Sequence, residues 1–179
     1  MVSEPIRVLC VEDNQLVAEA IARKLHGHGE FEWLGWVNSA AALTEKITQT
    51  CPTVVCMDLD IPGEDTFAMV RSVGERCPAA RVLMLTGHVR QDYIDRALSA
   101  GAWGYLSKGE ESRVIIDGIR RVAAGEFVLG TIARDGFHGS RPNPQPPAAP
   151  GPPTEPAPEP RARGVIEVLR RVIRKPSSL

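Results

Sequence analysis

The chain has 179 residues, of which 43% are hydrophobic, and its formal net charge is −1. This length suits one ordinary domain, or one domain with a tail, and the hydrophobic share is enough for a packed core. The near-neutral charge gives no electrostatic reason to expect that the whole molecule binds nucleic acid. No segment approaches the ~18 apolar residues of a membrane span, and Glu12 and Asp13 interrupt the N-terminal region where a signal peptide would lie. We therefore expect a cytoplasmic protein.

The chain contains four cysteines, Cys10, Cys51, Cys56 and Cys77. None of them forms a C-x-x-C pair, and no histidine pair lies nearby at the spacing of zinc ligands. Cys10 and Cys56 lie inside apolar runs, so we expect both to be buried as small hydrophobic side chains. This usage is typical of a reduced, cytosolic compartment, where disulfides are rare.

Apolar runs of strand length alternate with helical patterns between residues 6 and 124. The spacing of apolar residues predicts five strand–helix pairs. In chain order these pairs are residues 6–11 and 15–25, 31–37 and 40–47, 53–57 and 67–73, 81–85 and 93–100, and 103–106 and 114–124. Helices between continuous apolar strands cover both faces of a parallel sheet, and right-handed crossovers make that sheet doubly wound. The predicted fold class is α/β, a flavodoxin-like doubly wound sheet of five parallel strands in the order 2-1-3-4-5.

The composition changes near residue 140, and half of residues 141–160 are proline. We predict one folded domain over residues 1–125 and a disordered Pro-rich linker over residues 126–160. A short basic amphipathic helix is predicted over residues 161–175, with apolar and arginine side chains on opposite faces. Such a helix binds a partner groove or an anionic membrane surface. The alternative is a remnant without function.

Polar residues follow four of the predicted strands at the point where each strand ends. They are Glu12 and Asp13 after the first strand, Asp58 and Asp60 after the third, Thr86 after the fourth, and Ser107 and Lys108 after the fifth. Ligands of open α/β sheets bind outside the carboxyl ends of the strands, so we expect these side chains to lie together. Thr86 and Lys108 are expected to be exposed there.

Each of these residues also has an ordinary structural explanation. Asp13 could be a helix N-cap, Thr86 a routine strand end, and Lys108 a solvated surface charge. Their joint placement favours a functional site, because neighbouring carboxylates repel one another unless a cation joins them. Mg²⁺ prefers carboxylate and phosphate oxygens, and a lysine with a hydroxyl suits the other oxygens of a phosphoryl group. The pattern therefore predicts a metal-assisted phosphoryl site with an aspartate nucleophile.

Four sequence motifs carry a resemblance to a known family. They are VLCVEDNQ with the acidic pair, VVCMDLDIPG with the candidate nucleophile, VLMLTGH with the hydroxyl, and AGAWGYLSKG with the aromatic residue and the lysine. In order and spacing, residues 5–125 resemble the receiver domain of two-component response regulators. The YLSKG ending is similar to the LuxR/NarL-like subfamily, whose members usually carry a helix-turn-helix DNA-binding domain. We expect that domain to be absent here, and therefore no direct DNA binding.

The resemblance implies a phosphoacceptor and a Mg²⁺ site. Asp58 would accept the phosphoryl group from a sensor histidine kinase or a phosphotransfer protein. Asp13 and Asp58 would hold Mg²⁺ directly, Glu12 through water, and Asp60 through its backbone carbonyl. The protein would catalyse only its own phosphoryl transfer and slow dephosphorylation, and would otherwise not be an enzyme.

The resemblance also implies a switch. Lys108 would pair with the phosphoryl oxygens, Thr86 would hydrogen-bond the phosphoryl group, and Tyr105 would turn inward behind it. Asp60 and His88 would flank the phosphoryl group and affect the dephosphorylation rate. These residues would form an element with two conformations, and the charge of the phosphoryl group would favour one of them.

Output is expected through protein contact with an unknown downstream partner. The surface formed by the fourth helix, fifth strand and fifth helix, which we expect to present Tyr93, Trp103 and Tyr105, is a candidate homodimer face. Two alternatives are a haloacid-dehalogenase-like phosphatase and a phosphorylation-independent binding module. The phosphatase needs a further acidic pair after the lysine to hold its metal. Here the acidic pair Glu12 and Asp13 comes first, and among the acids after Lys108 it is Asp117 that lies at an interior helical position. Loss of Asp58 or Lys108 would favour the binding module, and both are present.

Overall fold

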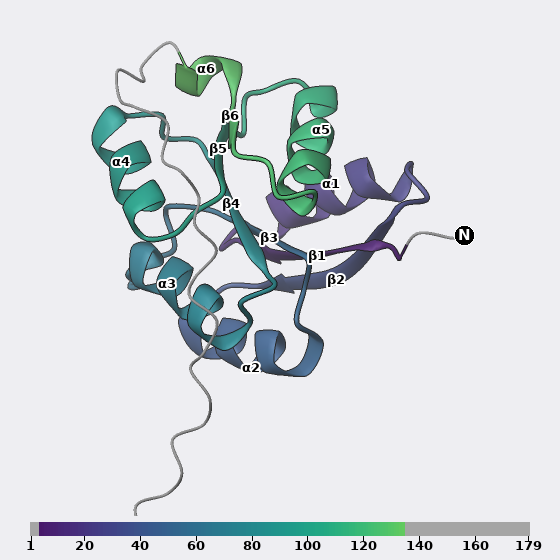
Figure 1. The fold of residues 1–179 in the computed structure, drawn as a ribbon, viewed down its shortest axis with the longest axis horizontal. Helices are drawn as coiled ribbons and strands as arrows, with labels where there is room; N and C mark the ends of the chain where they lie inside the picture. The colour runs from purple at the N-terminus through teal and green to yellow at the C-terminus, as the bar shows by residue number, and fades with distance from the viewer. Residues whose placement is uncertain (1–3, 135–179) are drawn as a thin grey trace, which may run out of the picture. The chain divides into compact units, whose positions relative to one another are not determined.

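The computed structural model describes residues 4–134, which form an α/β domain around one parallel sheet (Figure 1). The strand order is β2-β1-β3-β4-β5-β6. The strands are β1 (Ile6–Val11), β2 (Phe31–Val37), β3 (Val54–Met57), β4 (Arg81–Thr86), β5 (Gly104–Ser107) and β6 (Val128–Leu129). The helices are α1 (Gln15–His26), α2 (Ala40–Thr50), α3 (Thr66–Arg76), α4 (Gln91–Ser99), α5 (Ser112–Ala123) and α6 (Thr131–Arg134).

The predicted fold class and the predicted order 2-1-3-4-5 are confirmed, and β6 extends that order beside β5. The sequence did not predict β6, because two residues are too few to show a periodicity. The structured part of the chain therefore continues past residue 125, where we expected the linker to begin, to the end of α6. The predicted linker beyond residue 134 and the predicted helix over residues 161–175 lie outside the described residues.

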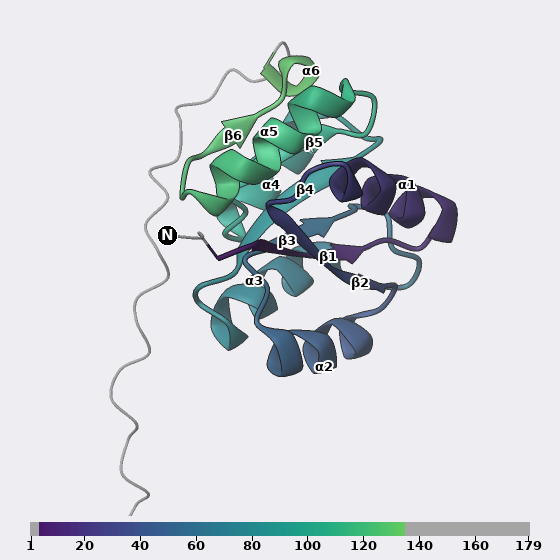
Figure 2. The same ribbon diagram turned by 90° about the vertical axis from the view of Figure 1, so that its right-hand side faces the viewer.

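Helices cover both faces of the sheet (Figure 2). Helices α1 and α5 contribute buried side chains to one core cluster, and α2, α3 and α4 contribute to the cluster on the opposite face. The central strands β3 and β5 are buried along their whole length. This explains why their sequences read as continuous apolar runs rather than as alternating patterns.

Short polar side chains start the first three helices. The side chains of Asn14, Ser39 and Asp65 accept hydrogen bonds from backbone N–H groups in the first turns of α1, α2 and α3. Each satisfies a donor that the helix itself leaves unpaired.

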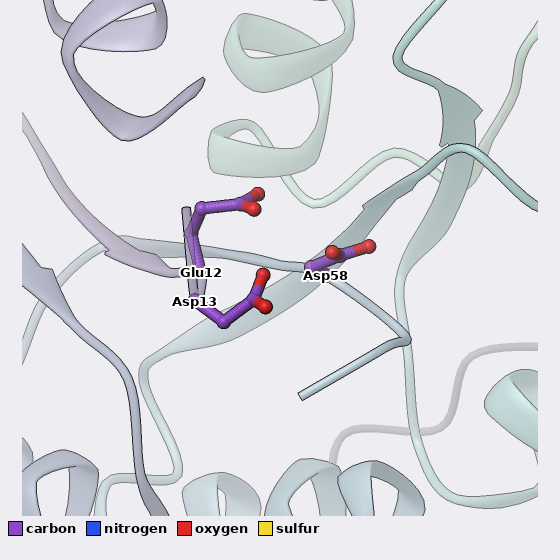
Figure 3. A group of neighbouring side chains, drawn as sticks. All are labelled: Glu12, Asp13 and Asp58. Atoms are coloured by element: carbon purple, nitrogen blue, oxygen red, sulfur yellow. The ribbon is translucent and has the colours of Figure 1, made fainter. Parts of the chain in front are cut away.

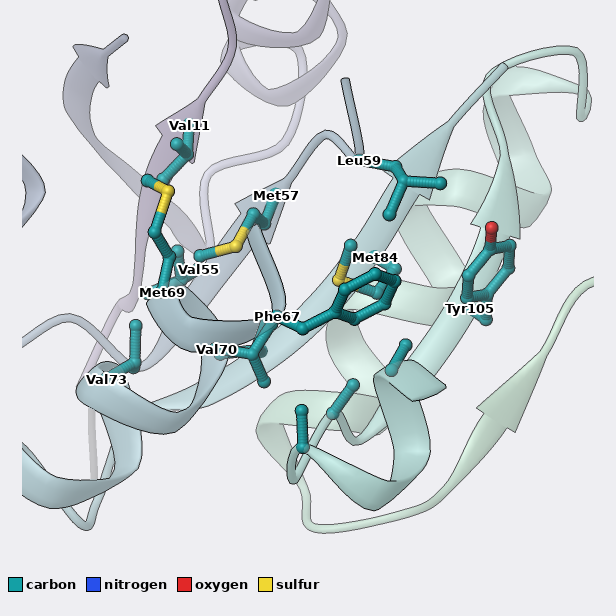
Figure 4. Close-up of a cluster of buried hydrophobic side chains, with 14 of the residues drawn as sticks. Val11, Val55, Met57, Leu59, Phe67, Met69, Val70, Val73, Met84 and Tyr105 are labelled. Atoms are coloured by element: carbon teal, nitrogen blue, oxygen red, sulfur yellow. The ribbon is translucent and has the colours of Figure 1, made fainter. Parts of the chain in front are cut away.

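The core beneath the carboxyl ends of the strands joins several elements. Met57 and Leu59 from the β3 region pack with Phe67 of α3, Met84 of β4 and Tyr105 of β5 (Figure 4). Met57, Met84 and Tyr105 are fully buried. This packing fixes the positions of the strand ends, on which the polar residues lie.

Gly104 lets β6 approach β5. A Cβ atom at this position would lie 2.9 Å from the backbone oxygen of Val128 and 2.8 Å from Leu83 Cδ1. We expect Gly104→Ala to destabilise the domain by about 1–3 kcal/mol, because the backbone of β6 must move to admit the methyl group. Urea denaturation measures the change.

Gly74 in α3 provides the matched control, because a Cβ there meets nothing within 4 Å. Gly74→Ala should stabilise the helix by roughly 0.5–1 kcal/mol. If the two alanine variants unfold at the same urea concentration, the proposed contact between Gly104 and β6 is not a packing constraint.

Cys51 and Cys77 form a disulfide, so the expectation of reduced cysteines is wrong for this pair. They are 26 residues apart in the chain, and only the folded structure brings their Cα atoms within 5.8 Å. Cys10 and Cys56 are free and buried, as predicted. Separately, the helices within residues 4–134 are all too short or too polar to cross a lipid bilayer.

Candidate functional site

The parallel register brings the predicted polar residues to one edge of the sheet. Val11 at the end of β1 pairs with Met57 at the end of β3, so Glu12 and Asp58 follow side by side. In the same way Thr86 pairs with Ser107, which places Lys108 at this edge. The Lys108 backbone N–H donates to the Thr86 carbonyl oxygen at 2.9 Å.

Three carboxylates meet at this edge. Glu12, Asp13 and Asp58 each offer an oxygen, and these oxygens lie within 4.8 Å of one another (Figure 3). Glu12 and Asp58 are buried, with 1% and 6% of their surfaces exposed, whereas Asp13 is open to solvent. An oxygen-only set of acidic groups that is open to solvent on one side fits a hard divalent cation such as Mg²⁺.

Asp13 is not the N-cap of α1. The capping side chain is that of Asn14, which accepts a hydrogen bond from the Leu16 N–H at 3.0 Å. The ordinary structural explanation for Asp13 therefore fails, and its carboxylate is left facing the other two (Figure 3).

Lys108 joins the two buried carboxylates. Its Nζ lies 2.7 Å from Glu12 Oε2 and 2.8 Å from Asp58 Oδ2. Burial lowers the pKa of Lys108, but the hydrogen bonds and charges of the two acids outweigh burial and raise it. Burial raises the pKa of Glu12, while the ammonium of Lys108 acts in the opposite direction. The lysine thus supplies the positive charge that keeps two acids together in a poorly solvated place.

Asp58 is held in place at both carboxylate oxygens. Its Oδ1 accepts a hydrogen bond from the Leu59 N–H at 2.7 Å, and its Oδ2 accepts one from Lys108. Its own backbone N–H donates to the Val11 carbonyl at 2.9 Å. A carboxylate fixed in this way, beside a lysine and two further acids, can act as a nucleophile toward an electrophile that arrives with a metal ion.

Thr86 and Tyr105 are connected through the backbone of His88. The Thr86 Oγ1 accepts a hydrogen bond from the His88 N–H at 3.1 Å, and the Tyr105 hydroxyl donates to the His88 carbonyl at 2.5 Å. Burial, with a smaller contribution from the charge of Asp60, raises the pKa of Tyr105, which keeps the hydroxyl protonated as a donor. Tyr105 is already turned inward in this structure.

Sequence reasoning missed a contact across the mouth of the site. The ring Nδ1 of His88 lies against the Asp60 carboxylate, although both side chains are more than half exposed. The two residues are 28 positions apart, so no local pattern could have indicated that they meet. Through this contact the loop after β3 touches the loop after β4.

Two expectations about exposure are wrong. Thr86 is fully buried, and the side chain of Lys108 is only 24% exposed. Thr86 is the last residue of β4 and Lys108 directly follows β5, and helices cover both faces of these strands, so both side chains are partly or fully shielded from solvent. Asp117, the acid that the phosphatase alternative would need, lies exposed on α5 beside Arg121, at 3.9 Å. It does not belong to the carboxylate cluster found among residues 4–134.

Comparisons with known proteins agree with this geometry. Residues 8–120 match the profile of the response regulator receiver domain family. The response regulator UvrY of Escherichia coli (strain K12) is 31% identical over 134 residues, which are 72% of this chain and 60% of that protein. The transcriptional regulatory protein DegU of Brevibacillus brevis is 29% identical over 120 residues, 67% of this chain and 51% of that protein.

A solved structure shows the same fold. The signal receiver domain of a putative response regulator NarL from Mycobacterium tuberculosis has a TM-score of 0.65 and 28% identity. The match covers 69% of this chain and 99% of that domain. The chain spans between 51% and 64% of the length of the first curated relatives that it matches, and the shared part is the receiver portion.

The family match covers more than half of the chain, and the fold and the acidic cluster agree with it. The chain belongs to the response regulator receiver domain family of two-component signalling proteins.

Proposed function

We propose that this receiver domain accepts a phosphoryl group on Asp58 from a sensor histidine kinase or a phosphotransfer protein. The observation that carries the proposal is the setting of Asp58, which is buried, bonded to Lys108 and next to Glu12 and Asp13. The attacking carboxylate oxygen would form a bond to phosphorus as the phosphorus–nitrogen bond of a phosphohistidine breaks. The freed imidazole leaves as a neutral group once it has taken a proton.

Mg²⁺ is the cofactor that this donor set fits. Asp13 and Asp58 would hold the ion directly, Glu12 through water, and Asp60 through its backbone carbonyl. The ion would neutralise the charge that the phosphoryl group adds beside three acids. Lys108 would then pair with a phosphoryl oxygen, as a compact point charge.

The switch follows from the bonds that Thr86 now makes. To donate to a phosphoryl oxygen, the Thr86 hydroxyl would have to turn toward Asp58, and its present bond from the His88 N–H would weaken or break. His88 also carries the carbonyl that holds the Tyr105 hydroxyl. A change at Thr86 would therefore reach Tyr105 and the loop that leads into α4.

Output would pass through protein contact on the face formed by α4, β5 and α5. Tyr93 lies partly exposed on α4, whereas Tyr105 is fully buried and is not part of that surface, contrary to the sequence expectation. This contact could be made with a second copy of the chain, as a homodimer, or with an unknown downstream protein.

The basic segment over residues 161–175 would serve as an auxiliary docking element for a partner or a membrane surface. We propose a cytoplasmic location.

Incubation with a small phosphodonor such as acetyl phosphate tests the proposal. We expect the full chain to gain the mass of one phosphoryl group in the presence of Mg²⁺ and none after chelation, because three carboxylates repel the donor without a cation. Intact-mass spectrometry measures the gain, and alkaline lability identifies the acyl phosphate. Equal labelling with chelator would contradict the metal's role.

Sedimentation of the phosphorylated and unphosphorylated forms tests the homodimer, since the phosphorylated form alone should double in mass.

A further inference from the structure

The disulfide between Cys51 and Cys77 joins the ends of two neighbouring helices. Cys51 follows α2 and Cys77 follows α3, and each donates its backbone N–H to the last turn of its helix, at 2.8 and 2.9 Å. The two helices pack side by side on the same face of the sheet (Figures 1 and 2). The bond therefore closes a covalent loop that contains β3, the strand that Asp58 directly follows.

The two cysteines differ in access to solvent. Cys51 is exposed, whereas Cys77 has 2% of its surface exposed. Cys51 also has a left-handed backbone conformation with a φ of 38°, the one non-glycine residue of this kind within residues 4–134. Glycine or asparagine is the usual choice at such a helix end. Backbone preference therefore does not explain why a cysteine occupies this position, whereas the disulfide with Cys77 requires one.

The other two cysteines show what an inert pair looks like in this domain. Cys10 and Cys56 are direct neighbours on adjacent strands, yet both are free and only 1% exposed. Burial raises the pKa of Cys56 to about 12 and also raises the pKa of Cys10. Protonated thiols without access to solvent neither attack disulfides nor react with oxidants. Reactive sulfur in the described part of the chain is thus confined to the Cys51–Cys77 pair.

We propose that Cys51–Cys77 is a reversible thiol–disulfide modification site whose reaction partner is a low-molecular-weight thiol. In reduction, a thiolate of the small thiol attacks Cys51 Sγ, the bond to Cys77 Sγ breaks, and Cys77 leaves as a thiolate that takes a proton. A second small thiolate then attacks the sulfur of the first on this mixed disulfide, which releases the small disulfide and the Cys51 thiol. The net reaction converts two small thiols and the protein disulfide into one small disulfide and two protein thiols.

The disulfide stabilises the folded domain because it restricts the conformations of the unfolded chain. Reduction opens a covalent loop between residues 26 positions apart, and the unfolded chain gains the freedom that the loop had removed. The bond lies before the amino ends of β3 and β4, whereas Asp58 and Thr86 follow or end the same strands at the opposite edge. Reduction is therefore expected to lower thermal stability and to leave the carboxylate site assembled.

Equilibration of the full chain in buffers of varied ratio between reduced and oxidised glutathione tests the proposal. Alkylation after denaturation, followed by mass spectrometry, should show two modified cysteines at oxidising ratios and four at reducing ratios. Peptide mapping should assign the two additional adducts to Cys51 and Cys77. In the native reduced protein Cys51 should react first, and Cys10 and Cys56 should not react.

Thermal unfolding of the same samples gives the second readout. The reduced protein should melt about 10 °C below the oxidised protein. Cys51→Ser and Cys77→Ser should each abolish this dependence on redox state, whereas the control Cys56→Ala should retain it, whatever its own melting temperature. Four alkylated cysteines at every ratio would show that the bond does not form. A bond that persists at reducing ratios until the protein is denatured would show that it is purely structural. Either result, or the absence of a melting difference, overturns the proposal.

Discussion

Asp58→Asn is expected to abolish phosphorylation by small phosphodonors and by phosphohistidine. The amide that replaces the carboxylate is a poor nucleophile, and it removes one of the three charged oxygens that attract a cation. The variant should still fold, because the amide oxygen can accept one of the two bonds now made by the Leu59 N–H and Lys108, and Lys108 keeps its ion pair with Glu12. Intact-mass spectrometry after incubation with acetyl phosphate and Mg²⁺ measures the loss.

Asp65→Asn is the matched control for this experiment. Asp65 lies near the same loop, but its exposed side chain caps α3 by accepting from the Ala68 N–H at 3.1 Å. Asparagine caps helices as well as aspartate does, so stability and labelling should both match the wild type. Undiminished labelling of Asp58→Asn would remove Asp58 from its proposed role. Loss of labelling in Asp65→Asn would show that the charge of the loop, rather than one nucleophile, controls the reaction.

Lys108→Ala is expected to have the largest effect on stability. Within residues 4–134, Lys108 is the only cation bonded to Glu12 and Asp58. The side chains of these two acids are 2% and 6% exposed. Breaking a buried ion pair from one side leaves an uncompensated buried charge, and we expect a loss of about 3 kcal/mol at neutral pH. Urea denaturation measures the free energy of unfolding. Lys46→Ala on α2 is the control and should change stability by less than about 0.5 kcal/mol.

The loss in Lys108→Ala should depend on pH. Burial raises the pKa of Glu12 in the folded state, and removing the lysine takes away the group that lowers it. An acid whose folded pKa lies above its unfolded value destabilises the fold while it is ionised and regains that stability as pH falls through the folded pKa. The difference from the wild type should therefore be largest above neutral pH and shrink on mild acidification.

A double variant separates charge from packing. Glu12→Gln in the Lys108→Ala background removes one of the two unpaired charges and should recover part of the lost stability at neutral pH. It should also flatten the pH dependence, because the titrating group is gone. If the double variant loses, relative to the wild type, the sum of the stability changes of the two single variants, the two residues are not coupled.

The sequence by itself determined the order of the first five strands and which polar residues meet at one edge of the sheet. Continuous apolar runs follow from strands buried on both faces, and parallel strands present their carboxyl ends at one edge. The acids after residues 11 and 57 were therefore predictable neighbours, although they are more than forty positions apart. The register of β1 on β3 confirms this inference.

Only the tertiary structure decided the contacts that depend on distance through space. The pairing of Cys51 with Cys77, the touch of His88 on Asp60 and the burial of Thr86 each join or cover residues from different elements. The spacing of apolar residues indicates the type of element and which of its faces is buried. It does not indicate which side chains from distant parts of the sequence come within bonding distance. The spacing of apolar residues also could not predict β6. Its two residues form a strand because they pair with Gly104 and Tyr105 of β5.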